Sequence, residues 1–241
     1  MTDVRFLPAG DTALIVEFGT EIQREMSDRV LSLSHRVRLA NLPGVTETVP
    51  TFRSLAVHYD PLTTSSATLV ASMRAFLSQA TEKHSPARLW RVPACYDERC
   101  APDLVEVAKS RGLTPAEVVL LHSGTRYHVY MVGFVPGYPY MGDLPPELVL
   151  PRRTDPRVRV PPGSIAVATT MTAVYPIESP GGWHLIGATP VRLFDSDWER
   201  PALFSPGDAV HFVPTSFADY ARLADEVAAG RYVVPSEGLE P

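Results

Sequence analysis

The sequence predicts an α+β N-terminal subdomain, with two helices on an antiparallel sheet, followed by a mainly-β barrel. In the first part of the chain, short apolar segments alternate with two long amphipathic ones, which is typical of strands combined with helices. In the last part, many short apolar segments are separated by glycine and proline turns, which favours a closed or partly closed barrel. The 241 residues are enough for each part to bury a core of its own.

The N-terminal part has the order strand, strand, helix, strand, strand, helix. A first helix is expected over residues 21–40, because apolar residues from Ile22 to Val37 recur every three or four positions and share one face. A second helix is expected over residues 65–80, with Thr64 or Ser65 as its N-terminal cap. The strands are expected over residues 4–7, 12–18, 45–49 and 54–59.

A polar, proline-bearing segment at residues 81–87 is the expected boundary and divides the chain into domains 1–84 and 85–241. Thr114 followed by Pro115 is a helix start signal, because the cap hydroxyl precedes a proline whose missing N–H costs nothing there. The helices of this domain are expected over residues 102–111, 115–122 and 216–229. Its strands are expected over residues 89–93, 127–132, 164–168, 172–175, 183–186, 191–194 and 209–213.

Composition argues against several classes of function. A formal net charge of -5 argues against a nucleic-acid partner. Lys83 and Lys109 are the only lysines and no P-loop motif occurs, so neither a lysine Schiff base nor a P-loop site is expected. Cys95 and Cys100 lack zinc-ribbon spacing, and we expect two reduced thiols and no metal. No signal peptide or membrane span is recognisable, and we expect a cytoplasmic protein without a membrane partner.

The segment from residue 133 to residue 187 has the most unusual composition. Prolines and glycines recur every few residues there and alternate with aromatic residues and arginines. Because proline fixes φ and glycine admits backbone geometries closed to other residues, such a stretch is expected to form rigid turns that interrupt any sheet they enter. Long ordered loops are often functional, and we therefore expect the binding site in this segment.

Four motifs of this segment carry a resemblance to a known family: G-F-V-P-G-Y-P-Y at residues 133–140, P-R-R at 151–153, V-P-P-G-S at 160–164 and S-P-G-G-W at 179–183. The sequence resembles the family that includes the B-type subunit of bacterial 5-oxoprolinase, allophanate hydrolase subunit 1 and the Kip-type inhibitor of a sporulation kinase. The resemblance covers nearly the whole chain. It implies a carboxyltransferase domain whose C-terminal barrel is cyclophilin-like.

Arg152 and Arg153 are the first candidates for binding an anionic ligand. They follow a proline, and guanidinium groups on a stiff backbone suit bidentate binding of a carboxylate or phosphate. The alternative is that these arginines form structural ion pairs with Asp143, Glu147 or Asp155.

The loop with Ser179, Gly181 and Gly182 is a second candidate. Its glycines could leave backbone N–H groups free for an oxyanion or phosphate, or could serve an ordinary β-turn. Trp183 and His184 follow at once, and a histidine there offers a donor or acceptor that titrates. His122 and His128 lack metal-ligand spacing and are expected to be structural.

Phe134, Tyr138, Tyr140 and Tyr175 accompany these motifs. Their rings could stack on a planar ligand or face a partner, or they could close one end of the barrel as core residues. No residue of the chain is convincing as a general base, and the catalytic residues remain unassigned.

The chain departs from the family pattern at residues 168–173. Where relatives have a Gly-Gly-x-Gln-Thr-Gly turn, this chain has Ala-Thr-Thr-Met-Thr-Ala, so Met171 stands in place of the glutamine and Thr172 is retained. Losing the glycines is expected to close off φ > 0 geometries, and losing the amide removes a group that could read a lactam or urea. Asp143 also replaces a glycine.

The resemblance implies the B-type subunit of an ATP-dependent 5-oxoprolinase complex, a cytoplasmic hetero-oligomer that opens 5-oxoproline to glutamate. It implies two partners in that complex: a homologue of the C-type subunit, related to allophanate hydrolase subunit 2, and a homologue of the A-type subunit. ATP with magnesium would act at the level of the complex, with no cofactor tightly bound by this chain, which is expected to be inactive alone. Two alternatives remain open: a carboxyltransferase half-site of the allophanate hydrolase or urea carboxylase type, and a non-enzymatic histidine kinase inhibitor.

Overall fold

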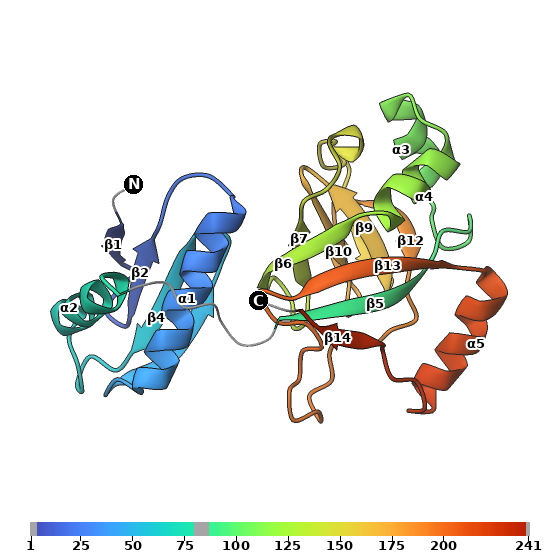
Figure 1. Ribbon diagram of the computed structural model, residues 1–241. Coiled ribbons are helices and arrows are strands. Elements are labelled where there is room, and N and C mark those ends of the chain that lie inside the picture. The colour runs from blue at the N-terminus through green and yellow to red at the C-terminus, as the bar shows by residue number, and fades with distance from the viewer. Residues whose placement is uncertain (1–3, 80–86, 240–241) are drawn as a thin grey trace. The chain divides into compact units, whose positions relative to one another are not determined.

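The computed structural model describes residues 4–79 and 87–239. The chain divides into two compact units, one up to Pro86 and one from Ala87 onward (Figure 1). Most of the expected boundary segment, residues 81–86, lies outside the described residues, as does the end of the expected second helix at residue 80. Each unit has its own hydrophobic core.

The N-terminal unit is a four-stranded antiparallel sheet with two helices, as the sequence predicts. Val30, Leu33 and Val37 of the first helix are buried, which confirms the face expected from their spacing. The helix begins later than expected, because Gln23 has extended backbone and Ile22 stays exposed. Ser65 caps the second helix by accepting a hydrogen bond from the amide of Thr68. The elements are β1 (Arg5–Pro8), β2 (Ala13–Glu17), α1 (Arg24–Ala40), β3 (Val45–Pro50), β4 (Ser54–Tyr59) and α2 (Ser66–Leu77), with the strand order β1-β2-β4-β3.

The second unit is a closed barrel of seven strands, which confirms the predicted fold class. Closure occurs where β12 pairs with β5 at Ala188 and Cys95. The barrel is mixed, because β5 and β13 run parallel while the other neighbours are antiparallel. Around the barrel the strands are β12 (His184–Ala188), β9 (Ser164–Ala168), β10 (Met171–Val174), β7 (Pro139–Gly142), β6 (Arg126–Val132), β13 (Ala209–Thr215) and β5 (Arg88–Cys95).

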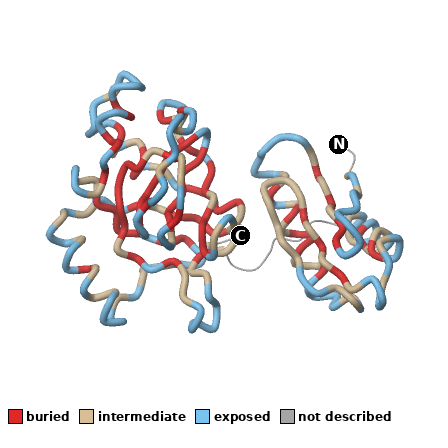
Figure 2. The backbone as a smooth tube through the Cα atoms, turned by 180° about the vertical axis from the view of Figure 1, so that it is seen from behind, coloured by how far each residue is buried: buried red, intermediate tan, exposed pale blue. Residues whose placement is uncertain are grey.

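In the described part of this unit, three α-helices accompany the barrel: α3 (Leu104–Arg111), α4 (Pro115–Ser123) and α5 (Phe217–Ala228) (Figure 1). A short 3₁₀ helix, η1 (Pro146–Leu148), precedes β8. Thr114 forms a capping box with Glu117 at the start of α4, which confirms the predicted start signal. The barrel strands are mostly buried, whereas α5 is largely exposed (Figure 2). Within the described residues, no helix is both long and apolar enough to cross a membrane.

The proline- and glycine-rich segment contains more strand than we expected. It supplies β7 to the barrel, and β8 (Arg157–Val160) pairs with β11 (Ser179–Gly181) as a separate two-stranded ribbon. A short edge strand, β14 (Ser236–Gly238), was also not predicted. The predicted strand at residues 191–194 is wrong: Val191 donates to the side chain of Thr189, and only an isolated bridge at Phe194 forms there.

Candidate functional site

Five aromatic side chains from three segments of the sequence gather near the strands β7, β10 and β12. The ring of Tyr138 lies 5.4 Å from Phe134, 4.9 Å from Tyr140 and 5.1 Å from Tyr175, measured between centroids. Trp183 lies 6.2 Å from Tyr138 and 6.0 Å from Tyr140. We call these five residues the aromatic face. The structure thus brings together all the aromatic candidates of the sequence, through edge-to-face and tilted contacts typical of aromatic pairs.

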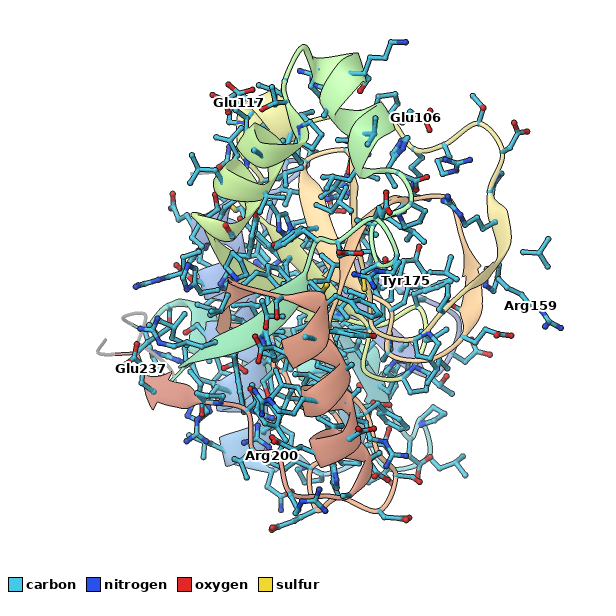
Figure 3. All side chains as sticks on the ribbon, turned by 90° about the vertical axis from the view of Figure 1, so that its right-hand side faces the viewer. Glu106, Glu117, Arg159, Tyr175, Arg200 and Glu237 are labelled. Atoms are coloured by element: carbon cyan, nitrogen blue, oxygen red, sulfur yellow. The ribbon has the colours of Figure 1, made fainter. Side chains whose placement is uncertain are left out.

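The aromatic face has a buried base and an exposed rim. Tyr138, Tyr175 and Trp183 are buried, Tyr140 is half-buried, and 61% of Phe134 is exposed. Figure 3 shows Tyr175 within the body of the barrel unit. Burial raises the pKa of Tyr138, Tyr140 and Tyr175 above that of a free phenol. The three hydroxyls are therefore protonated at neutral pH, so they can donate hydrogen bonds but cannot act as bases.

Arg152 lies beside this face. Its guanidinium carbon is 5.9 Å from the ring centroid of Trp183, and its side chain is exposed. Among the described residues no carboxylate pairs with Arg152. A guanidinium group over an aromatic ring and without an ion-pair partner is free to bind a carboxylate.

Arg153 does not share this freedom, because it belongs to a cluster around Asp103. The Oδ1 atom of Asp103 accepts hydrogen bonds from Arg153 Nη1 at 3.2 Å and from Arg157 Nη2 at 2.6 Å. Its Oδ2 atom accepts from the amide of Leu185 at 2.7 Å. We call Asp103, Arg153 and Arg157 the Asp103 clamp. The arginine partner is thus Asp103, which none of the sequence alternatives included.

The Asp103 clamp ties the arginine-rich segment to β12. Burial alone would raise the pKa of Asp103, but hydrogen bonds from Arg157 and Leu185 and the two guanidinium charges outweigh it, so the pKa lies below its usual value. The amide of Arg153 also donates to the carbonyl of Gly182 at 2.8 Å. These bonds fix the backbone on which the neighbouring Arg152 is carried.

The segment with Ser179, Gly181 and Gly182 is a strand and its end rather than an open anion loop. Neither glycine has a positive φ, and Gly181 pairs with Arg157 across the ribbon. A Cβ atom on Gly181 would lie 2.2 Å from the hydroxyl oxygen of Tyr175, whereas one on Gly182 would meet nothing closer than 3.7 Å. Gly181 is therefore needed to admit Tyr175. The hydroxyl of Ser179 is buried without a hydrogen-bond partner.

His184 supports the arginine-rich segment from the other side. Its Nε2 atom lies 3.0 Å from the carbonyl oxygen of Pro151, which can only accept, so Nε2 carries the proton. The Nδ1 atom of His184 is buried and has no partner. His184 thus positions Pro151, the residue immediately before Arg152.

The turn between β9 and β10 keeps the geometry that its missing glycines would favour. Thr169 has φ 53°, so the expectation that φ > 0 geometries are closed off in this turn is wrong at that position. Asp143, which follows β7 and also stands where relatives have glycine, likewise has a positive φ of 71°. The amide of Thr169 donates to the carbonyl of Leu150 at 2.6 Å, which helps to hold this strained conformation. The loop path of a glycine turn is therefore retained by non-glycine residues.

Met171 and Thr172 lie on opposite faces of β10. Thr172 contacts the buried His122, whose Nε2 atom is 2.9 Å from the threonine hydroxyl, while Tyr96 bonds to His122 Nδ1 at 2.7 Å. Burial lowers the pKa of His122 to about 3, which confirms a neutral structural histidine. Because side chains alternate along a strand, the buried Met171 lies on the face of β10 opposite Thr172.

The cysteines and the potential metal ligands of the described residues do not form a second candidate site. Cys95 and Cys100 are both free, and burial with a hydrogen bond to Cys95 raises the pKa of Cys100 to about 12. In the described part of the chain, no three or more His, Cys, Asp or Glu side chains form a group that could hold a metal ion. The aromatic face with Arg152 is therefore the best candidate for a functional site.

Comparison with known proteins places this chain among relatives. Residues 4–204 match the family model described as carboxyltransferase domain, subdomain C and D. The B-type subunit of 5-oxoprolinase from Bacillus subtilis (strain 168) is 37% identical over 228 residues, which cover 90% of this chain and 95% of that protein. The B-type subunit of 5-oxoprolinase from Escherichia coli O157:H7 is 36% identical over 205 residues, or 85% and 93%.

A solved structure shares the fold at lower sequence identity. The crystal structure of the K. lactis urea amidolyase matches 98% of this chain with a TM-score of 0.80, at 19% sequence identity, and the match covers 16% of that longer chain. In that protein the same fold is therefore one part of a larger polypeptide. On the family match and the two relatives, the chain belongs to the carboxyltransferase domain family, subdomains C and D.

Proposed function

We propose that this chain is the B-type subunit of an ATP-dependent 5-oxoprolinase complex, which opens the lactam ring of 5-oxoproline to give glutamate. The observation that carries the proposal is the similarity to two proteins named as B-type subunits of 5-oxoprolinase, at 37% and 36% identity over 95% and 93% of their lengths. A urea-type reaction has weaker support, since the K. lactis urea amidolyase is 19% identical to this chain and indicates only a shared fold.

Arg152 is assigned to the carboxylate of the substrate. 5-Oxoproline combines a carboxylate with a nearly flat ring, and the aromatic face offers ring surfaces beside the one guanidinium of its neighbourhood that lacks an ion pair in the described chain. The half-buried ring of Tyr140 lies 6.0 Å from that of Trp183 and adds to the surface on which the lactam ring can stack. This chain therefore binds and orients the ring.

The nucleotide is assigned to another subunit. The strand β11, which contains Gly181, pairs its backbone with β8, and neither Gly181 nor Gly182 has the positive φ of a phosphate-binding nest. The described residues around the aromatic face thus do not fit a nucleotide phosphate. ATP with Mg²⁺ supplies the free energy that activates the poorly electrophilic lactam carbonyl, and we assign its binding to the partner subunits.

The general base is also assigned to a partner. The tyrosines of the aromatic face have raised pKa values, and His122 is buried, neutral and bonded through both ring nitrogens. Asp103 is engaged by two guanidinium groups and one amide. The Nδ1 atom of His184 has no partner but is buried, so none of these described residues offers an accessible base. A chain that supplies substrate-binding groups without a base is one half of a shared active site, and the isolated chain should not turn over substrate.

Lysine substitutions at the two adjacent arginines test this assignment. Arg152→Lys keeps the positive charge but loses the planar guanidinium, which can bind a carboxylate through two hydrogen bonds. Because one charge-assisted hydrogen bond contributes about 1.5–3 kcal/mol, KM of the assembled complex should rise by roughly ten- to a hundredfold. The free chain should melt as the wild type does. Arg153→Lys is the matched control: it should lower the melting temperature and leave KM within about threefold. Unchanged KM in Arg152→Lys would remove Arg152 from the substrate site.

Met171 is assigned to substrate selection, because the family resemblance places a glutamine at its position. An apolar wall discriminates weakly, whereas a polar group that must be paired discriminates strongly. We therefore expect Met171→Gln in the assembled complex to change the preference between 5-oxoproline and a less polar lactam. If Met171→Ala leaves kcat/KM unchanged for both lactams, the turn does not contact substrate.

A further inference from the structure

We infer that Phe134 is the anchor on which a partner subunit docks, so that the partner closes the open rim of the aromatic face. The partner presents an apolar pocket that receives the phenyl ring. This inference rests on the proposed function, because it concerns the subunit that completes the proposed site.

The backbone of Phe134 is strained. Its φ is 72°, in the left-handed region where a Cβ atom is disfavoured and where glycine would be free of strain. A bulky aromatic residue in this region is an outlier, and such strain persists where the surrounding structure over-determines it and a function requires it.

The burial of Phe134 leads to the same conclusion. The side chain is 61% exposed, although its ring is among the largest apolar groups of the chain. Its ring contact is the edge of Tyr138 at 5.4 Å, and Tyr138 is itself buried and held by Tyr140, Tyr175 and Trp183. Phe134 therefore stands as an exposed ring on a rigid aromatic base.

The turn around Phe134 holds the ring in a fixed position. The amide of Gly133 donates to the carbonyl of Tyr138 at 3.0 Å, and the amide of Tyr138 donates to the carbonyl of Val135 at 3.1 Å. Gly137 has φ 78°, and a Cβ there would lie 2.7 Å from Cβ of Phe194, so this glycine packs the turn against its neighbour. A pre-organised aromatic side chain loses little conformational entropy on binding, which favours its use as an interface anchor.

A partner subunit is the occupant that the other observations require. The relatives at 37% and 36% identity are named as subunits, and in the K. lactis urea amidolyase this fold covers 16% of a longer chain. The proposed site lacks a base, and Arg152 at its rim is open. A subunit that docks on Phe134 would cover this rim and bring the missing base, while leaving Arg152 to the anionic substrate.

The test uses Phe134→Gly, which removes both the ring and the strain. The free variant should melt within about 3 °C of the wild type, because relief of strain offsets the lost contact with Tyr138. Its dissociation constant for the homologue of the C-type subunit, measured by calorimetry with the full chains, should rise about thirtyfold or more, as for a truncated aromatic hot spot. Leu120→Ala, which removes another exposed apolar group on α4, is the matched control and should bind as the wild type does.

The possible outcomes are distinct. Wild-type affinity of Phe134→Gly, or an equal loss in Leu120→Ala, would overturn the inference. If Phe134→Gly does not fold, Phe134→Asn replaces it, because asparagine tolerates the left-handed region. Arg152→Lys should assemble normally and lose only substrate affinity. A complex that assembles through Phe134 but does not act on 5-oxoproline would refute the proposed function and leave the anchor intact.

Discussion

Replacing Asp103 with asparagine should destabilise the barrel unit strongly. The Asp103 side chain is 4% exposed, and asparagine would leave Arg153 and Arg157 without a counter-charge while Nη1 of Arg157 is already buried without a partner. Breaking a buried ion pair costs about 3–5 kcal/mol, and we take the lower end because a quarter of each arginine side chain is exposed to solvent. A loss of about 3 kcal/mol corresponds to a decrease in melting temperature of roughly 6–12 °C.

Thermal unfolding of Asp103→Asn and of a matched control measures this effect. Glu106 lies 3.9 Å from the same Arg153 but is 70% exposed, so Glu106→Gln should change the free energy of unfolding by less than about 1 kcal/mol. Because the pKa of folded Asp103 lies below its ordinary value of 3.8, its stabilisation is present above that pH and is lost as the pH falls further. The difference between wild type and Asp103→Asn should therefore shrink below pH 3.8. Equal melting temperatures of Asp103→Asn and Glu106→Gln at pH 7 would refute this reasoning.

Three other predictions concern single positions. Gly181→Ala should lower the free energy of unfolding, measured in urea, by about 1–3 kcal/mol, because its Cβ would overlap the Tyr175 hydroxyl. Gly182→Ala should be tolerated, and adding Tyr175→Phe to Gly181→Ala should restore part of the lost stability. Thr169→Gly should raise the melting temperature by about 1–3 °C by relieving a positive φ; a decrease would show that this turn is unstrained. The pKa of His122 is about 3 in the folded chain, so between pH 6.5 and pH 3 this histidine is neutral when folded and protonated when unfolded. The free energy of unfolding should therefore fall by up to about 1.4 kcal/mol for each unit by which the pH decreases across this range. An imidazole NMR signal of the folded protein that titrates near pH 6.5 would contradict this.

Local sequence signals were sufficient for the fold class and for most elements. The spacing of apolar residues predicted α1 and α2, and Thr114 with Pro115 predicted the start of α4. These signals can be read from the sequence because they depend only on neighbours within one or two helical turns. The strands β7 and β11 escaped prediction because their prolines and glycines suppress the alternation that marks a strand. The strand β8, with the sequence RVRV, does alternate, but it is only four residues long and lies between Pro156 and Pro161. These strands form because neighbouring strands supply their hydrogen bonds, and two of those pairings join segments distant in sequence: β10 with β7, and β8 with β11.

The sequence identified most residues of the candidate site, but it did not show what each of them does. The five aromatic residues, Arg152 and Arg153 were identified as candidates from the sequence, and the structure brings the aromatic ones into contact. Nothing in the sequence distinguished Arg152 from Arg153, because the difference depends on Asp103, which lies 50 residues before Arg153 and pairs with it only in the folded chain. Likewise, the need for Gly181 comes from Tyr175 rather than from φ.

Reconstitution with the partner subunits tests the central claim most directly. The chain is co-expressed with homologues of the A-type and C-type subunits, and glutamate formation from 5-oxoproline is measured with and without ATP. We predict ATP-dependent ring opening by the complete complex, loss of that activity when this chain is omitted, and no turnover by this chain alone. Ring opening that continues at the same rate without this chain would contradict its role as the B-type subunit.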